Sequence, residues 1–491
     1  MGPFRAKRAG MSGPAGAGPR APGGDLLRWA PIRRLVGLRA FQFLVILPTA
    51  GVVGVILLST AVGIEHPSFN FGTVFTWVVW WGALLLSFVA LGRAWCLVCP
   101  LGALGEWVQR LSFWRRVPYT AGYHFRWPKP LRNMGLATAL FIVFVWLDNG
   151  YGMSNSPRMT AGLIVVIALG AAWINLFFER RAFCRYVCPL TAFIGLCSLF
   201  SVLELRRREA GTCRSRCATK DCFRGNDRQY GCPMGEFPGG AMDTNLHCIL
   251  CTECIKGCPH DNIALRFRPP GRDLWAMRRP QADGAVAAAV IVGLTTVLPL
   301  VLLLLLPGLR RALAGVLPAG VPPNDFPRLA AVGLLFALGI GLGLGLVWGF
   351  SALARLSARQ AAPTAGALFA SFAYALIPMA LFKMMADLLD HALRTWGPLV
   401  DATRALALDF PLNRVVPGRV TVIHLLGPGS VYALQAALVL GGLVWSLYAL
   451  WRISERLFGD RRAALAAWVP MAGLSLVLTL MSLWTLGIGL L

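Results

Sequence analysis

The chain has 491 residues, of which 56% are hydrophobic and only 14% are charged, a balance that excludes an ordinary soluble domain. Its 47 Lys and Arg residues outnumber its 22 Asp and Glu residues and give a formal net charge of +25. These basic residues gather in alternate loops, a distribution typical of a membrane protein, so nucleic acid is not expected as a partner.

The first predicted segment is a disordered basic tail over residues 1–34. Residues 1–24, MGPFRAKRAGMSGPAGAGPRAPGG, are rich in Gly, Pro, Ala and Arg and cannot build a hydrophobic core. Arg33 and Arg34 precede an apolar run and imitate a twin-arginine signal. Because that run is longer than the apolar region of a signal peptide, we expect a retained first transmembrane helix.

Nine apolar runs follow the tail, each close to the roughly 20 residues that cross a bilayer core. Backbone polar groups find no water there, so each run is predicted to be a helix. The runs cover residues 38–63, 73–92, 133–149, 161–178, 284–306, 328–350, 366–388, 430–451 and 465–490. The first four form a predicted membrane domain over residues 35–203, and the last five form a second one over residues 271–491.

The Lys and Arg residues indicate which loops face the cytoplasm. The chain up to position 39 holds eight of them, residues 93–132 hold seven and residues 179–282 hold seventeen. By contrast, residues 64–72 hold none and residues 148–160 hold one. We therefore predict a multi-pass protein of a bacterial-type inner (cytoplasmic) membrane, with its N-terminus and the loops after the second and fourth helices in the cytoplasm.

Two similar motifs stand at the cytoplasmic ends of the second and fourth predicted helices. They read RAWCLVCPLGAL (93–104) and RRAFCRYVCPLTAF (180–193), and each contains Arg, a small residue, an aromatic residue, Cys, a short gap and Cys-Pro-Leu. If the two helices pack together, four thiols converge at the membrane surface. These thiols belong to Cys96, Cys99, Cys184 and Cys188.

Four converging thiolates match either one iron–sulfur cluster or a tetrahedral metal ion. Pro100 and Pro189 interrupt the helices just past the second Cys and free backbone N–H groups that can bond cluster sulfurs. The alternative is that the thiols pack between helices as small apolar groups. The duplicated spacing favours ligation, and with it a third iron–sulfur centre at the membrane.

The strongest motif lies in a predicted cytoplasmic insert over residues 204–270. The segment CILCTECIKGCPH has the C-x2-C-x2-C-x3-C-P spacing of bacterial ferredoxins. Disulfides are not expected on the reducing side of the membrane, and zinc sites normally use two separated Cys pairs. We therefore predict [4Fe–4S] ligation by Cys248, Cys251, Cys254 and Cys258.

A second set of cysteines precedes this motif in the segment CRSRCATKDCFRGNDRQYGCP. Cys213, Cys217, Cys222 and Cys232 have the looser spacing C-x3-C-x4-C-x9-C-P. In two-cluster ferredoxins the fourth Cys of each run ligates the other cluster. By analogy, the predicted ligands of cluster one are Cys213, Cys217, Cys222 and Cys258. The predicted ligands of cluster two are Cys232, Cys248, Cys251 and Cys254. The fold class predicted is a polytopic α-helical membrane protein with a ferredoxin-like two-cluster insert.

Basic residues flank the insert at 205–209 and 266–279. Beside transmembrane helices they are predicted to bind anionic lipid headgroups. The alternative is that they dock an acidic partner such as a flavodoxin. Residues 101–114 and 190–203 are too short to span, so we expect interfacial or re-entrant helices that seat the clusters against the bilayer, with Cys197 as a buried thiol.

A quinone pocket is expected near the membrane motifs. Trp95, Glu106 and His124 are its candidate residues. Each is a weak signal by itself, because a Glu on an amphipathic helix face is commonly solvated.

The C-terminal membrane domain carries ionisable residues in its third helix. Lys383, Asp387 and His391 fall four residues apart on one helix face. Such residues at membrane depth indicate function, whereas near the outer interface they form ordinary ion pairs. A soft-metal site, for example for copper, is an alternative that would use Met379, Met384, Met385 and His424.

The four N-terminal helices, the paired Cys-Pro motifs and the eight-Cys insert together resemble the polyferredoxin-type membrane iron–sulfur proteins (NapH/NosR-like) of anaerobic respiration. The resemblance covers about residues 35–270. The first membrane motif is C-x2-C-P where the family usually has C-x3-C-P. No periplasmic flavin-binding domain precedes the first helix, so a full NosR-type protein is not expected.

The resemblance implies an electron-transfer subunit rather than a stand-alone enzyme. Such a subunit passes electrons between the quinone pool, or a cytoplasmic donor, and a respiratory reductase. Its partners are membrane lipid, quinone or quinol, and redox proteins of a respiratory complex. The resemblance also covers accessory proteins for copper or cytochrome oxidase maturation, and a redox sensor is a third alternative.

Overall fold

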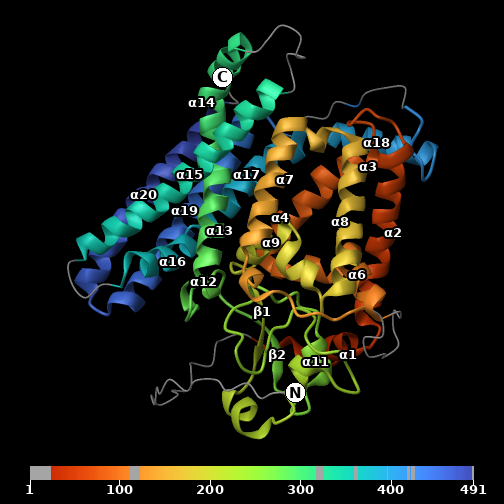
Figure 1. The fold of residues 1–491 in the computed structure, drawn as a ribbon, viewed down its shortest axis with the longest axis vertical. Coiled ribbons are helices and arrows are strands. Elements are labelled where there is room, and N and C mark those ends of the chain that lie inside the picture. The colour runs from red at the N-terminus through yellow and green to blue at the C-terminus, as the bar shows by residue number, and fades with distance from the viewer. Residues whose placement is uncertain are drawn as a thin grey trace.

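The computed structural model describes residues 24–110, 122–316, 326–358, 363–394, 396–416, 421 and 426–488. Figure 1 shows long helices in two neighbouring groups, the N-terminal helices in red to yellow and the C-terminal helices in green to blue. In the described part of the chain, eight helices are long and apolar enough to cross a membrane, and one shorter apolar helix joins them. The predicted polytopic α-helical membrane fold is confirmed.

The N-terminal group starts with α2 (Phe41–Val62). The second long helix begins as α3 (Phe71–Val74), passes through a π-helical stretch and ends as α4 (Trp81–Leu91). The group closes with α7 (Gly135–Tyr151) and α8 (Pro157–Phe177). Ser156 caps α8 by accepting a hydrogen bond from the Met159 N–H, and Pro157 occupies the first turn, where its missing N–H is not needed.

The C-terminal group contains eight labelled helices and a π-helical turn. They are α13 (Ala282–Val292), the turn Gly293–Val297, α14 (Leu298–Val316), α15 (Phe326–Ser357), α16 (Ala365–Ala375), α17 (Ile377–Arg394), α18 (Trp396–Leu408), α19 (Pro428–Phe458) and α20 (Arg461–Gly487). Nearly all of α13 is buried, and it packs against α7 on one side and α15 and α16 on the other. Helix α13 therefore joins the two groups.

One close helix contact in this group depends on glycine. A Cβ atom on Gly343 of α15 would lie 2.6 Å from the Cα atom of Gly293, between α13 and α14. Small residues let helix backbones approach this closely in membranes.

Two short helices follow the Cys-Pro motifs. Helix α6 (Pro100–Arg110) packs on α8 and α2. Helix α9 (Leu190–Ser198) lies against α4, α7 and α13, and its residues Thr191–Ser198 are all buried. Of the two alternatives predicted for this segment, the interfacial one is wrong for α9, because neighbouring helices enclose it, and the re-entrant one stays a prediction. The predicted burial of Cys197 is confirmed, since the residue is 2% exposed.

The insert begins and ends with two short antiparallel strands, β1 (Leu203–Arg207) and β2 (Ile263–Phe267). Between them, loops carry the cysteines together with the short helices α10 (Asp221–Arg224) and α11 (Glu253–Gly257). Helix α1 (Ala30–Gly37) lies beside α11 at the lower end of Figure 1, where the Thr252 hydroxyl donates to the Val36 carbonyl at 3.2 Å.

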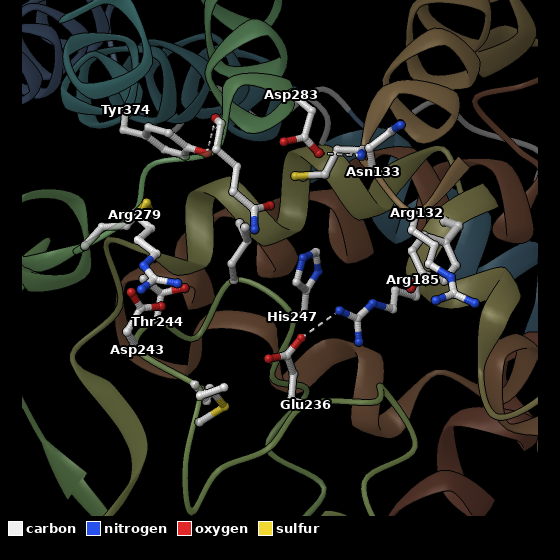
Figure 2. Close-up of a pocket in the computed structure, with 17 residues that line it drawn as sticks. Arg132, Asn133, Arg185, Glu236, Asp243, Thr244, His247, Arg279, Asp283 and Tyr374 are labelled. Carbon is white, nitrogen blue, oxygen red and sulfur yellow. Dashed lines mark hydrogen bonds and ion pairs between the residues drawn. The ribbon is translucent and has the colours of Figure 1, made fainter. Parts of the chain in front are cut away.

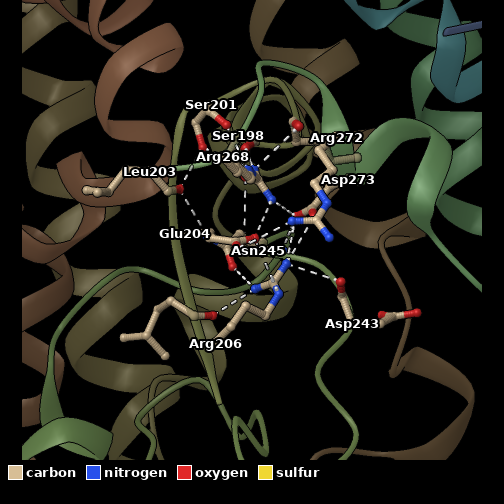
Figure 3. Close-up of polar contacts among 12 residues, drawn as sticks. Ser198, Ser201, Leu203, Glu204, Arg206, Asp243, Asn245, Arg268, Arg272 and Asp273 are labelled. Carbon is tan, nitrogen blue, oxygen red and sulfur yellow. Dashed lines mark hydrogen bonds and ion pairs between the residues drawn. The ribbon is translucent and has the colours of Figure 1, made fainter. Parts of the chain in front are cut away.

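The insert is anchored by a network of buried ion pairs beside α12 (Arg272–Ala276), shown in Figure 3. Arg206 lies 3.0 Å from the Asp273 carboxylate, and Arg266 lies 2.7 Å from Glu204. Arg268 is fully buried, pairs with Asp273 and donates to the Ser201 carbonyl at 2.8 Å. The prediction that these flanking arginines bind lipid headgroups is wrong for Arg206 and Arg268, because their charges are neutralised inside the protein.

Candidate iron–sulfur sites

The first membrane motif places its two cysteines on either side of a helix break. Cys96 lies in the short helix α5 (Trp95–Val98), and Cys99 follows in extended conformation. Pro100 then begins α6. The backbone N–H groups of Leu101 and Gly102, in the first turn after the break, donate hydrogen bonds to the Cys99 sulfur. The predicted role of Pro100 in freeing backbone donors agrees with this geometry.

The second membrane motif repeats the same backbone path. Cys184 lies in the π-helical turn Phe183–Val187, and Cys188 follows with a ψ of 121°. Pro189 then leads into α9, and the Leu190 N–H donates to the Cys188 sulfur. Two segments with different sequences between their cysteines thus adopt equivalent local structures.

The structure brings the four membrane cysteines together. A Cβ atom on Gly102 would lie 2.9 Å from the Cys184 sulfur, so this glycine separates the sulfur of one motif from the backbone of the other. Burial, together with the nearby thiols of Cys96 and Cys99, raises the pKa of the Cys188 thiol to about 12. Each thiolate charge makes ionisation of the neighbouring thiols less favourable. The four thiols can therefore ionise together only around a cationic centre.

Two buried arginines connect the motifs reciprocally. Arg93, three residues before Cys96, donates to the Cys184 carbonyl oxygen at 3.0 Å. Arg181, three residues before Cys184, donates to the Cys96 carbonyl oxygen at 3.2 Å. Both arginines are 1% exposed.

Glu106 completes this arrangement. Its carboxylate accepts from Arg181 Nε at 2.7 Å and is 3% exposed, so the solvated alternative for Glu106 is wrong. The carboxylate neutralises a guanidinium that would otherwise be buried without a counter-ion. The other quinone candidates lie elsewhere: the Trp95 indole donates to Ser87, and His124 stands in the loop before α7 with a positive φ of 51°.

The first insert group contains Cys213, Cys217, Cys222 and Cys258. Asn262 contacts two of them, because its backbone N–H donates to the Cys258 sulfur at 3.2 Å and its side-chain amide donates to the Cys213 sulfur at 3.1 Å. A Cβ atom on Gly239 would lie 3.0 Å from the Cys213 sulfur and 3.4 Å from the Cys222 sulfur. Burial raises the pKa of Cys222 to about 11, with further contributions from the other three thiols.

The second insert group contains Cys232, Cys248, Cys251 and Cys254, which line one small cavity. Burial raises the pKa of Cys248 to about 12 and that of Cys232 to about 11. Leu250 and Thr252 have positive φ angles of 54° and 65°. Positive and negative φ angles thus alternate along residues 250–252. This alternation turns successive backbone N–H groups to one side and is common around iron–sulfur sites.

The two insert groups have the exchanged composition expected from two-cluster ferredoxins, since Cys258 lies with the first group and Cys232 with the second. Sets of four thiolates are the usual ligands of [4Fe–4S] clusters, so all three groups fit such clusters. In the part of the chain that the structure describes, no three His, Cys, Asp or Glu side chains are placed to hold a single metal ion. Ligation by these twelve cysteines stays a prediction.

The three cysteine groups follow one another in space. Cys254 of the second insert group is close enough to Cys222 of the first for their charges to interact. On the other side, the Arg181 guanidinium acts on both Cys251 and the membrane residue Cys184. The second insert group therefore lies between the first insert group and the membrane group.

Basic residues of the membrane motifs hold the insert in this position. Arg180 donates to the Cys232 carbonyl at 2.6 Å, and Arg93 donates to the Leu246 carbonyl at 2.9 Å. The Arg181 backbone N–H adds a bond to the Pro233 carbonyl at 3.1 Å. Each contacted carbonyl belongs to a loop that carries a cysteine of the second insert group.

A cavity of about 250 Å³ lies beside the second group, between the insert and the lower ends of α7 and α13 (Figure 2). His247, directly before Cys248, lies in the middle of it, with Arg185 beside it and Asp283 above. His247 Nδ1 and Arg185 Nε are buried without a hydrogen-bond partner among the described residues. Burial lowers the pKa of His247 well below its usual value, and Arg185 contributes, so the imidazole is neutral.

Sequence reasoning missed this cavity. None of Trp95, Glu106 and His124 lines it. The available signal was the position of His247 next to a predicted cluster ligand, which a spacing argument about cysteines does not use.

The candidate residues of the C-terminal domain are placed only in part. Lys383 is 2% exposed and pairs with Asp387 one turn along α17, whereas His391 is exposed. Met379 is buried and accepts from the Thr479 hydroxyl at 3.5 Å, and Met384 and Met385 are half-buried. His424 lies outside the described residues, so the soft-metal alternative stays a prediction.

Residues 73–118 and 160–208 match a protein family described as a 4Fe-4S binding domain. The matched residues contain all four membrane cysteines and end before the cysteines of the insert. This part of the chain is similar to a 4Fe-4S binding domain. The resemblance to polyferredoxin-type iron–sulfur proteins is thereby confirmed over part of the chain.

Three relatives illustrate this similarity. The putative electron transport protein YccM of Escherichia coli is 23% identical over 206 residues, which cover 36% of this chain and 52% of YccM. An uncharacterized protein of Methanocaldococcus jannaschii is 25% identical over 195 residues, which cover 36% of this chain and 73% of that protein. The methylamine utilization ferredoxin-type protein MauN of Paracoccus denitrificans is 31% identical over 151 residues, or 28% of this chain and 53% of MauN.

The chain thus spans about half the length of YccM and of MauN. No solved structure matches it. One of these relatives is named as a putative electron transport protein and another as a ferredoxin-type protein, and the multiple apolar helices of this chain fit a membrane protein.

Proposed function

We propose that this protein transfers electrons along three [4Fe–4S] clusters, two in the insert and one at the membrane motifs. The observation that carries the proposal is the continuous succession of three four-cysteine groups, linked through Cys222 and Cys254 and through Arg181. Clusters of this kind supply one-electron chemistry. The chain's own residues bury some of the cysteines and shield the others in part, donate hydrogen bonds to sulfurs and hold the groups next to one another.

We propose that the insert lies on the cytoplasmic side of a bacterial-type inner membrane. The concentration of Lys and Arg in residues 179–282 supports it. A reporter protein that is active only in the cytoplasm should be active when it is fused within the insert. A reporter protein that is active only in the periplasm should be active when it is fused within residues 64–72. The reverse pattern would contradict the orientation.

The membrane-side redox partner in this proposal is a quinol. Its head group would occupy the cavity of Figure 2, where the unpaired His247 Nδ1 and Arg185 Nε offer hydrogen bonds next to the second cysteine group. The acceptor would be a respiratory reductase. Binding of a short-chain quinone, followed by protein fluorescence, should weaken in His247→Phe and persist in His260→Phe, because His260 is exposed and lies outside the cavity.

Iron content tests the cluster proposal. Anaerobically purified protein should contain about twelve irons per chain, four for each cluster. Cys99→Ser or Cys188→Ser should remove the same spectroscopic species while the two insert clusters keep their electron paramagnetic resonance signals. Unchanged iron content in both variants would show that the membrane thiols only pack helices, and zinc in place of iron would exclude the clusters.

A further inference from the structure

Most arginines of the insert region are engaged inside the protein. Arg207 donates to the carbonyls of Gly239 and Gly240, and Arg208 pairs with Asp25. Arg206 and Arg268 belong to the network of Figure 3. These residues hold the fold of the insert together, so their charges are not offered to a partner.

Five other basic residues are not engaged in this way. They are exposed, and within the described part of the chain none of their side chains forms an ion pair: Arg214, Arg216, Lys220, Arg224 and Arg228. The same segment, residues 213–228, contains only Asp221 and Asp227 as acidic residues. Asp221 is half-buried and accepts from Asn226 at 3.0 Å. We call the five exposed basic residues the basic tip.

The basic tip shares its segment of the chain with three cysteines of the first group. Arg214 and Arg216 lie between Cys213 and Cys217, and Lys220 lies two residues before Cys222. Cys213 and Cys217 are half-buried, whereas Cys251 and Cys254 of the second group are buried. The positive charges therefore lie next to half-buried cysteines of the first group in the chain.

The place of the basic tip limits what it can bind. In Figure 1 the yellow-green coil that carries it lies at the lower end of the molecule, on the far side of the insert from the long helices. Lipid headgroups lie near the ends of those helices, so a membrane surface does not reach the tip. A soluble partner does.

We propose that the basic tip binds a small acidic electron-carrier protein. Complementary charge steers such partners together and orients them, and here it would orient the carrier against the first cysteine group. The inference rests on the proposed function for the nature of the partner, but the binding surface itself is defined by exposed charge. It assigns the cytoplasmic end of the chain of clusters to residues 213–228.

The test is direct binding of a fluorophore-labelled acidic flavodoxin to the full-length protein in nanodiscs of phosphatidylcholine. Arg214→Glu with Arg216→Glu should weaken binding by about tenfold or more at low salt, because two attractive charges become repulsive. Raising the salt should weaken wild-type binding strongly, since charges more than about 10 Å apart are screened at 0.1 M.

The matched control changes Arg461→Glu and Arg462→Glu at the start of α20. These arginines are also exposed, and the change in net charge is the same. The control should bind like the wild type. The proposal would be overturned if the tip variant bound the flavodoxin as tightly as the wild type, or if the control weakened binding as much as the tip variant. Preferential binding of a labelled single-stranded RNA to the basic tip would also overturn it.

Iron analysis of the same samples separates this inference from the proposed function. Full iron content with unweakened binding in the tip variant defeats the docking surface alone. Missing iron in the wild type defeats the cluster proposal, while salt-dependent binding that is lost in the tip variant still supports the surface.

Discussion

Arg93 donates a hydrogen bond to the carbonyl oxygen of Cys184 at 3.0 Å, and the second motif returns the contact from Arg181 to Cys96 at 3.2 Å. Each Arg thus holds the cysteine of the other motif rather than its own. The repeated Arg three residues before the first Cys is explained by this exchange. Two helices that are far apart in sequence are braced at the point where their sulfurs meet.

The first prediction removes one brace. Arg93→Lys keeps the positive charge but loses the planar group that reaches Cys184, Thr191 and Leu246 together. We expect a loss of about 2–3 kcal/mol in stability, since buried carbonyls are left without a charged donor. We also expect about four fewer irons per chain. Thermal unfolding and iron analysis measure both, with the exposed Arg158→Lys as a control that should change neither.

The second prediction concerns the glycine between the membrane motifs. In Gly102→Ala the new Cβ would lie 2.9 Å from the Cys184 sulfur, a distance that forces the sulfur to move. The signal assigned to the membrane centre should disappear, while both insert signals remain. In Gly162→Ala nothing lies within 4 Å of the new Cβ, so this control should keep all signals and gain up to about 1 kcal/mol from helix propensity. Retention of the membrane signal in Gly102→Ala would contradict the assigned geometry.

Cysteine spacing carried most of what the sequence could predict. A cluster loop is a local structure, so the ligand count, the pairing of Cys-Pro motifs and the exchange of Cys232 and Cys258 follow from distances along the chain. The apolar runs predicted the helices for the same reason, because each run must satisfy its own backbone.

The contacts between distant segments were beyond such reasoning. Glu106 lies on a short helix that also carries Gln109 and Arg110, and nothing in this local sequence indicates that Glu106 will be buried against Arg181. Arg206 and Arg268 likewise lie in basic stretches that are typical of lipid-binding flanks. Only the fold shows that Asp273 lies beside both of them. The cavity beside His247 is lined by five segments that meet only in the folded chain.

The third prediction concerns the reduction potential of the first insert cluster. Asn262 donates from its side chain to the Cys213 sulfur, and such bonds favour the more negative, reduced cluster. Asn262→Ala should therefore shift the potential of this cluster to a more negative value and leave the second one unchanged. Redox titration followed by electron paramagnetic resonance measures the shift.

The control for that experiment is Asn226→Ala. Asn226 bonds the Asp221 carboxylate and the Gly257 carbonyl in the same region but donates to no sulfur that the structure records. It should leave the potential of the first cluster in place. An equal shift in both variants would mean that loosening of the insert, rather than loss of the bond to sulfur, changes the potential.

The last prediction concerns the carboxylate of Asp273, labelled in Figure 3. Burial alone would raise the pKa of Asp273, but Arg206 and Arg268 outweigh burial and hold the pKa below the ordinary value of 3.8. A carboxyl whose pKa is lower in the folded than in the unfolded state stabilises the fold at every pH above its unfolded-state pKa. This stabilisation is lost as the pH falls through its folded-state pKa.

Titration of Asp273 should therefore not change the melting temperature of the wild type between pH 7 and pH 5. Below about pH 4 the wild type should lose the stabilisation that Asp273 contributes. Asp273→Asn removes the nearer of the two counter-ions that Arg206 and Arg268 share, since Glu204 lies 3.8 Å and 3.9 Å from them. The variant should therefore melt at a lower temperature than the wild type at pH 7, and this difference should narrow below pH 4. Asp243→Asn is the control, because its carboxylate bonds only a backbone N–H of Arg278 among the described contacts. A gap between Asp273→Asn and the wild type that stays constant down to pH 3 would contradict the assigned ionisation.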